Sequence, residues 1–198
     1  MPRTLEYFFD YASPYTYLAA SQIPGLIERT GCTVEYKPML LGGLMVETGN
    51  SPPGSVPAKG AYMGADIARW LKRYDLPFEF NPHFPVVTIK PLRATLVVLD
   101  ESGPKEDFFR LKDALFKAVW VDKANPNEVD QLRAIIEGAG LDADHILERC
   151  NDPAIKAQLK ANTDEAVSRG AFGAPTFYVG DEMFFGNDRL DFVEEALQ

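Results

Sequence analysis

Two short stretches of the chain combine small polar side chains with turn-forming residues in a way that suits the binding of an anion. Ser13 and Pro14 directly follow an aromatic-rich segment near the N-terminus, and Asn187 and Asp188 follow a second apolar segment near the C-terminus. Serine and aspartate are preferred N-cap residues, and proline suits the first helical position because its missing N–H would be unsatisfied there anyway. Both stretches therefore predict helix N-termini, where free N–H groups and a partial positive charge attract anions.

The elements that would position these residues follow the order of a thioredoxin-like fold. Segments 4–9, 33–39, 176–179 and 182–185 are short and β-prone, which predicts four strands. A helix to Thr30, kinked near Pro24 and ended by Gly31, separates the first two, so we expect a right-handed parallel crossover. Gly180 and Asp181 suit a type II′ hairpin turn between the last two. The predicted fold class is α/β, a thioredoxin-like mixed sheet with an all-helical insertion.

The middle of the chain carries apolar stripes at helical spacing. These stripes and their capping signals predict helices over 61–74, 92–101, 104–121, 127–138 and 153–168, and a last helix over 189–197 with Asp188 as its N-cap. Segment 40–60 is rich in Gly and Pro, and we expect a long loop there, either a lid or binding loop or a plain connector. The chain is interpreted as a thioredoxin-like domain from about 1–60 and 170–198 with a helical insertion over about 61–169.

Composition argues against several classes of partner. The chain has 20 basic and 29 acidic residues, a formal net charge of −9, so nucleic acids and anionic membranes are poor partners. No segment has the ~20 apolar residues that span a bilayer, and the N-terminal apolar run is too short for a signal peptide, so we expect a cytoplasmic protein. Cys32 and Cys150, like His83 and His145, have no partner at metal-ligand or catalytic spacing, so no metal site is expected.

Two separated motifs carry a resemblance to a known family. Residues 9–18 read Phe-Asp-Tyr-Ala-Ser-Pro-Tyr-Thr-Tyr-Leu, and residues 173–176 and 180–190 form a second motif near the C-terminus. Together they resemble the signatures of the 2-hydroxychromene-2-carboxylate isomerase family, which is related to kappa-class glutathione transferases. DsbA-type oxidoreductases share this fold but carry Cys-x-x-Cys where residues 13–16 here read Ser-Pro-Tyr-Thr. Without a sulfur at either position, the chain cannot form the mixed disulfide that thiol–disulfide exchange requires.

The resemblance implies that glutathione is the cofactor and supplies the missing sulfur. Ser13, as the catalytic residue, would donate its hydroxyl to that sulfur and favour the thiolate, although a plain N-cap is the alternative. Pro175 would be the cis-proline of thioredoxin folds rather than an ordinary strand-entry proline, and would turn the backbone of Ala174 toward the ligand. Asp188 would receive the ligand's ammonium or would only cap its helix. The full implied glutathione-binding set is Ser13, Ala174, Pro175, Phe185, Gly186, Asn187 and Asp188.

The substrate side of the resemblance is weaker. Asn50, Trp70 and Phe84 resemble family positions near the substrate pocket, but Met45 stands where the isomerases carry a lysine that suits a substrate carboxylate. Lys59 and Lys90 are the candidates to replace that lysine.

The resemblance implies a glutathione-dependent cis–trans isomerase of 2-hydroxychromene-2-carboxylate-like aromatic metabolites, with glutathione recycled. The alternatives are a kappa-class-like transferase that conjugates glutathione to electrophiles, and a protein that binds glutathione without turnover. The family also implies a homodimer.

Overall fold

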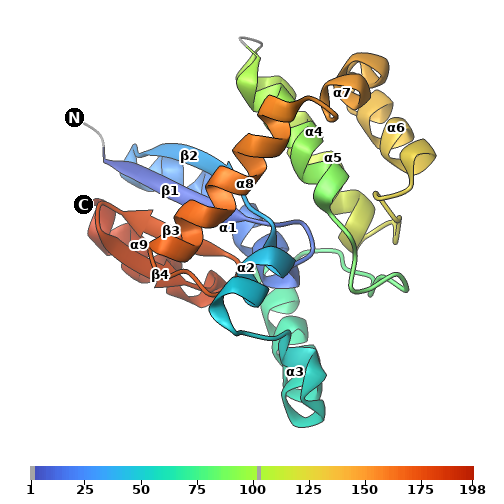
Figure 1. Ribbon diagram of the computed structural model, residues 1–198. Coiled ribbons are helices and arrows are strands. Elements are labelled where there is room, and N and C mark those ends of the chain that lie inside the picture. The colour runs from blue at the N-terminus through green and yellow to red at the C-terminus, as the bar shows by residue number, and fades with distance from the viewer. Residues whose placement is uncertain (1–2, 102–103) are drawn as a thin grey trace.

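The computed structural model describes residues 3–101 and 104–198, and so leaves out the first two residues of the N-terminal segment. Its centre is a four-stranded mixed sheet in the order β2-β1-β3-β4 (Figure 1). The strands are β1 (Thr4–Phe9), β2 (Thr33–Pro38), β3 (Thr176–Val179) and β4 (Glu182–Phe185). The β1–β2 pair is parallel, and the β1–β3 and β3–β4 pairs are antiparallel, which confirms the predicted mixed sheet.

Helices cover both faces of this sheet and extend beyond one side of it. In Figure 1, α8 crosses one face, α1 and α9 lie on the other, and α4 to α7 form a helical body that shares the main core with the sheet. The helices are α1 (Pro14–Thr30), α2 (Leu41–Thr48), α3 (Pro57–Tyr74), α4 (Ile89–Asp100), α5 (Lys105–Trp120), α6 (Val129–Gly138), α7 (Ala143–Arg149), α8 (Pro153–Ser168) and α9 (Leu190–Leu197), with 3₁₀ turns η1 (Pro53–Ser55) and η2 (Asn187–Arg189).

Strand β1 is buried on both faces, which explains why its sequence is almost continuously apolar. Alternate side chains of a strand point to opposite faces of the sheet. Tyr7 faces the main core, where its ring stacks on Phe177 at 4.9 Å between centroids. Phe8 faces α8 and meets Tyr178 edge-on at 5.6 Å, in a smaller cluster that also contains Met39 and Leu44.

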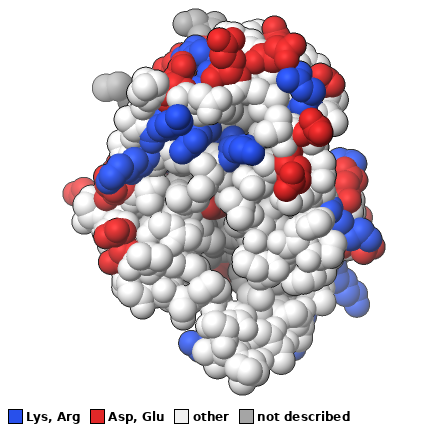
Figure 2. Space-filling view, turned by 45° about the vertical axis from the view of Figure 1, so that its right-hand side comes forward, with Lys and Arg blue, Asp and Glu red and all other residues white. Residues whose placement is uncertain are grey.

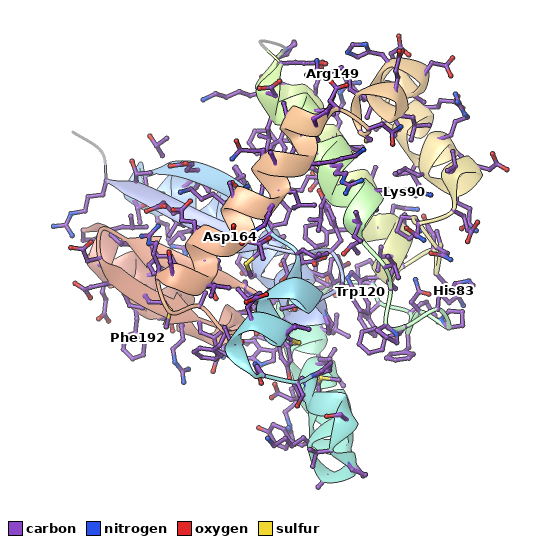
Figure 3. All side chains as sticks on the ribbon, viewed as in Figure 1. His83, Lys90, Trp120, Arg149, Asp164 and Phe192 are labelled. Carbon is purple, nitrogen blue, oxygen red and sulfur yellow. The ribbon has the colours of Figure 1, made fainter. Side chains whose placement is uncertain are left out.

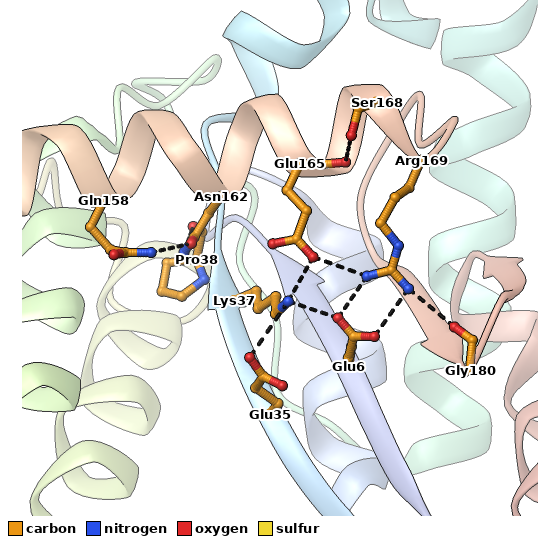
Figure 4. A network of polar contacts seen from close by, with 10 residues as sticks. All are labelled: Glu6, Glu35, Lys37, Pro38, Gln158, Asn162, Glu165, Ser168, Arg169 and Gly180. Atoms are coloured by element: carbon orange, nitrogen blue, oxygen red, sulfur yellow. Dashed lines mark hydrogen bonds and ion pairs between the residues drawn. The ribbon is translucent and has the colours of Figure 1, made fainter.

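An ionic network fastens the end of α8 to the sheet (Figure 4). Glu6 of β1 pairs with Lys37 of β2 at 2.7 Å and with Arg169, which follows α8, at 2.6 Å. Glu165 pairs with both of these cations, at 2.7 and 3.0 Å. Burial opposes the charge on Glu6, but hydrogen bonds from Arg169 and Lys37 outweigh it and lower the pKa of that carboxyl. Arg169 also donates to the Gly180 carbonyl at 3.1 Å, and this bond holds the start of the segment after α8 against the turn between β3 and β4.

Segment 40–60 corrects the sequence prediction, because it is largely helical. It folds into α2 and η1, and α3 already begins at Pro57. Two contacts remote in sequence stabilise α2: Leu44 packs against the cluster under α8, and the Leu41 N–H donates to the Asp10 carboxylate at 2.8 Å. Such contacts override the low helix propensity of two adjacent glycines.

Two smaller corrections concern helices. Helix α7, whose N-cap Asp142 accepts from the His145 N–H at 3.1 Å, is not among the helices predicted from the sequence. Asp188 does not cap α9 as predicted, because it lies inside η2, and Arg189 occupies the N-cap position without a side-chain hydrogen bond.

Candidate active site

The connection from β1 to α1 is held by one buried carboxylate. Asp10 is 1% exposed and accepts from the Ala12 N–H at 3.0 Å, the Thr88 hydroxyl at 2.6 Å and the Leu41 N–H at 2.8 Å. These donors belong to the segments that lead into α1, α4 and α2. Burial raises the pKa of Asp10, although the three hydrogen bonds favour the charged form. Asp10 therefore ties three helix starts together beside Ser13.

Ser13 is the N-cap of α1, as predicted, and also reaches across to the C-terminal motif. Its Oγ accepts from the Thr16 N–H at 3.2 Å, and Pro14 fills the first helical position. The same hydroxyl donates to the carbonyl oxygen of Ala174 at 2.9 Å. Ser13 is 4% exposed, so its hydroxyl lies at a shielded helix N-terminus.

The loop after α8 carries Ala174 and is fixed through four consecutive carbonyl oxygens. These oxygens accept from four different parts of the chain: Phe172 from Asn50 at 2.6 Å, Gly173 from Thr176 at 2.8 Å, Ala174 from Ser13 at 2.9 Å, and Pro175 from the Gly186 N–H at 3.0 Å. The Ala174–Pro175 bond is cis, as the resemblance implied. The Ala174 N–H makes no hydrogen bond to another described residue, so it can donate to a ligand.

The second predicted helix terminus lies against the first. Turn η2 packs on α1, and it follows Gly186, whose φ of 100° favours glycine. Asn187 is 2% exposed, and its Nδ2 makes no hydrogen bond of ordinary geometry with the described residues, although the Tyr74 hydroxyl lies near enough to feel its side chain. Asp188 is exposed and pairs with Arg189 at 2.6 Å. An unsatisfied buried amide beside a carboxylate can take a polar ligand group, because burial without a partner costs free energy.

Phe185 closes one side of this loop. Its ring lies 4.5 Å from that of Phe172, centroid to centroid, and fills the space where a side chain at Gly173 would project. Ser13, Ala174, Pro175, Phe185, Gly186, Asn187 and Asp188 are therefore brought together along the join between the two motifs.

A cavity of about 380 Å³ opens beside the start of α1. Its lining residues come from α1, η1 and α3: Tyr15, Pro53, Ala58, Lys59, Tyr62 and Met63. The Tyr15 hydroxyl donates to Asp66 of α3 at 3.0 Å, and burial together with this carboxylate raises the pKa of Tyr15. In Figure 2 the lower end of the molecule, where α3 projects, shows few charged side chains. The helical spacing of residues 59, 62, 63 and 66 is the sequence signal that marks this face of α3.

The residues predicted to contact the substrate do not line this cavity. Asn50 is engaged with the Phe172 carbonyl, and Trp70 packs on Tyr74, further along α3, at 5.2 Å between ring centroids. Phe84 is half-buried and packs against the main core, with its ring 6.2 Å from that of Trp120 between centroids.

The two candidate replacement lysines are separated by the fold. Lys90 donates to the Asn127 carbonyl at 2.9 Å, within the helical body to the right of Figure 3. Lys59 lines the cavity, whereas Met45 is half-buried on α2.

Cys32 and Cys150 are both unpaired and pack in the main core rather than among the residues of this site. In the described ranges, no three His, Cys, Asp or Glu side chains gather in a way that could hold a metal ion. None of the helices within residues 3–101 and 104–198 is long and apolar enough to cross a membrane.

This fold and site define a class of protein. Residues 4–198 match the family model described as a DSBA-like thioredoxin domain, so the chain belongs to the DsbA-like thioredoxin family. Its relatives place it more narrowly. It is 34% identical over 199 residues to the 2-hydroxychromene-2-carboxylate isomerase of Sphingobium xenophagum, covering 100% of this chain and 99% of that protein. It is 31% identical over 210 residues to human glutathione S-transferase kappa 1, covering 100% of this chain and 92% of the relative.

A solved structure supports the same placement. The structure of a selenomethionine 2-hydroxychromene-2-carboxylate isomerase superposes with a TM-score of 0.86 at 27% identity, covering 98% of this chain and 94% of the other. The resemblance to the isomerase family is thereby confirmed, with the kappa-class transferases as further relatives.

Proposed function

We propose that this chain is a glutathione-dependent enzyme that catalyses the cis–trans isomerisation of 2-hydroxychromene-2-carboxylate-like aromatic metabolites. The observation that carries the proposal is the placement of the Ser13 hydroxyl, at a helix N-terminus 2.9 Å from the Ala174 carbonyl, in a segment that has no cysteine. A site built this way can hold a thiolate but cannot form a disulfide with it. The isomerase relative, which matches the chain over its full length, supports the choice of reaction.

The described residues fit glutathione in three respects. The unpartnered Ala174 N–H and the carbonyls beside it suit the peptide backbone of the cysteinyl part. The buried, unsatisfied Asn187 Nδ2 suits the carboxylate at the γ-glutamyl end, and the Asp188 carboxylate suits the ammonium there. Phe185 and Gly186 shape the wall between these two ends. We therefore infer that this set holds glutathione.

When bound, glutathione would supply a thiolate that adds to an electron-poor carbon of the substrate and leaves again after rotation about the resulting single bond. Ser13 would orient and stabilise that thiolate by turning its hydroxyl proton from the Ala174 carbonyl to the sulfur. The N-terminus of α1 adds positive potential at the same place. Splitting one difficult isomerisation into addition and elimination lowers the barrier of each step.

The proposal is tested by assaying 2-hydroxychromene-2-carboxylate with and without glutathione, while total free glutathione is followed. We expect turnover that requires glutathione and leaves its amount unchanged. Turnover at the same rate without glutathione, or no turnover of any 2-hydroxychromene carboxylate in its presence, would overturn the proposal.

The second candidate is a kappa-class-like transferase. Two observations favour it: the kappa-class relative is nearly as similar as the isomerase, and Met45 occupies the position of the isomerases' lysine. The two activities share thiolate addition and differ in whether elimination follows. In the same assay, one glutathione lost for each substrate consumed would identify the transferase.

We propose further that the protein acts in the cytoplasm as a homodimer. The family resemblance supports the dimer, and two unpaired, buried cysteines suit a reducing compartment. Sedimentation equilibrium would give twice the 22.0 kDa chain mass for a dimer, and a single chain mass would contradict it.

A further inference from the structure

One face of α3 brings together the groups that give the cavity its chemical character. Lys59, Tyr62, Met63 and Asp66 are spaced three, four and seven residues apart, so they share one side of the helix. Lys59, Tyr62 and Met63 line the cavity, and Tyr15 closes it from α1. Tyr15 also links the cavity to the candidate active site, because it lies two residues after Ser13 in the first turn of α1.

Lys59 is the single charged residue among the six that line the cavity. No carboxylate among the described residues lies within ion-pair distance of its ammonium, although the chain as a whole carries an excess of acidic residues. The nearest acidic member of the same face, Asp66, is already engaged: it accepts from Tyr15 at 3.0 Å and lies 4.0 Å from Arg69. The one formal charge on the lining is therefore positive and forms no ion pair within the described ranges, while the carboxylates of Asp66 and Asp188 act on the Tyr15 side of the cavity.

The other residues that line the cavity favour a ligand with a flat, apolar ring. Pro53, Ala58 and Met63 are apolar, and Tyr15 and Tyr62 present aromatic rings. A volume of about 380 Å³ is at the small end of the range for small-molecule sites. A ring compound with a carboxylate would bury its ring on these walls and pair its charge with Lys59, whereas a neutral analogue would gain the apolar contact alone.

We propose that this cavity binds the aromatic substrate and that Lys59 selects anionic over neutral substrates by pairing with the substrate carboxylate. Lys59, on α3, would thus provide the positive charge for the substrate carboxylate that Met45, on α2, cannot provide. The identity of the ligand as the substrate rests on the proposed function, whereas the preference of the cavity for an aromatic anion does not.

The preference is tested with two unreactive probes that differ in charge, 3-nitrobenzoate and 3-nitrobenzamide, titrated by calorimetry in the absence of glutathione. We expect wild type to bind the benzoate at least ten times more tightly than the amide. Lys59→Gln should remove this preference, and Lys59→Arg should retain it. The matched control is Lys160→Gln, an exposed lysine on α8 that pairs with Asp164 and should leave both affinities unchanged. The Met63 methyl resonance, assigned with Met63→Leu, should shift as the benzoate binds.

Equal affinity of wild type for the two probes, an unchanged preference in Lys59→Gln, or a Met63 resonance that does not move would overturn the proposal. Because these titrations contain no glutathione, they give an answer even if glutathione does not bind.

A second arm tests the assignment to the substrate. With glutathione, 4-chloro-3-nitrobenzoate and its amide undergo substitution in which a carbon–sulfur bond forms and chloride leaves. Each kcat/KM is divided by the uncatalysed rate constant of the same substrate. Lys59→Gln should lower this ratio about tenfold for the benzoate and leave it unchanged for the amide. An equal effect on both would show that the cavity does not hold the substrate.

Discussion

The hydroxyl of Ser13 donates to the carbonyl oxygen of Ala174 at 2.9 Å, although the two residues are 161 positions apart in the chain. The Ser13 Oγ itself accepts from the Thr16 N–H at 3.2 Å, so the hydroxyl both caps α1 and joins it to the loop before β3. A hydroxyl has one proton to donate. Donation to a bound thiolate therefore has to replace the bond to Ala174 rather than add to it.

Ser13→Ala should consequently change stability as well as thiol chemistry. Loss of the N-cap costs about 1 kcal/mol, and loss of the hydrogen bond to a buried carbonyl costs about 1 kcal/mol more, so the free energy of unfolding should fall by roughly 2 kcal/mol. The pKa of the thiol of bound glutathione should rise and kcat should fall. Denaturant unfolding and thiolate absorbance as a function of pH measure the two effects.

The control for Ser13→Ala is Asp142→Ala, which removes the N-cap of α7 far from the site. It should lower stability and leave the pKa of the bound thiol unchanged. If Ser13→Ala behaved in the same way, Ser13 would be a cap and nothing more.

Asp188 and Arg189 should have opposite effects on glutathione affinity. Asp188 caps no helix, so Asp188→Asn should barely alter the melting temperature of the ligand-free protein. If it receives the ammonium of glutathione, affinity should drop about ten- to a hundredfold. Arg189→Gln should raise affinity, because Arg189 pairs with the same carboxylate at 2.6 Å and competes for it. Calorimetry measures both variants, and an unchanged affinity in Asp188→Asn would remove Asp188 from the binding set.

The ionic network under α8 should make stability depend on pH in a specific direction. The hydrogen bonds of the network hold the pKa of Glu6 below the ordinary 4.5. The contribution of Glu6 to stability is therefore fully present above pH 4.5 and is lost as the pH falls through the lowered pKa. At pH 7, Glu6→Gln should lower the free energy of unfolding by about 2 kcal/mol, allowing for partial solvent screening.

Urea unfolding of wild type and Glu6→Gln between pH 7 and pH 3 checks this prediction. The difference in the free energy of unfolding between the two proteins should become smaller as the pH falls toward 3. Glu47→Gln, at an exposed position on α2, should give no difference at any pH. A Glu6→Gln difference that stayed constant down to pH 3 would contradict the depressed pKa.

The cysteines should take no part in redox chemistry. Burial raises the pKa of the Cys150 thiol to about 11, so the reactive thiolate is scarce at pH 7, and Cys32 is buried as well. We expect no glutathione-linked reduction of insulin by wild type or by the Cys32→Ser, Cys150→Ser double variant. Insulin reduction by the double variant would contradict the proposed mechanism directly.

Local signals in the sequence were sufficient wherever a helix or strand is bounded by its own residues. Ser13 with Pro14 and Gly31 mark the two ends of α1, and the predicted first strand matches β1 residue for residue. Helix α2 could not be predicted in this way, because Asp10 satisfies its first N–H from another part of the chain. The cap predicted at Asp188 was wrong because Gly186, at a φ of 100°, directs the chain into a 3₁₀ turn first.

The residues around the cavity could not be predicted from the sequence, for a different reason. The cavity exists because the start of α3 lies against Tyr15, and no local pattern specifies how two helices cross. Phe84 illustrates the same limit, since an aromatic residue in a connecting segment can face a pocket or, as here beside Trp120, the core.

The walls of the cavity come largely from the first two turns of α3, whereas Ser13, Ala174 and Asn187 are held by the sheet and the loops at its end. Tyr15 is the lining residue that adjoins Ser13, and substitutions elsewhere in the cavity, at sites that share no partners with the thiol site, have nearly additive effects. In evolution, residues 59, 62 and 63 can therefore be exchanged to accept a new compound while the part of the chain that would hold the thiol is inherited unchanged. Enzymes that descend from one ancestor with this arrangement can therefore differ in their substrates while they share the same kind of reaction.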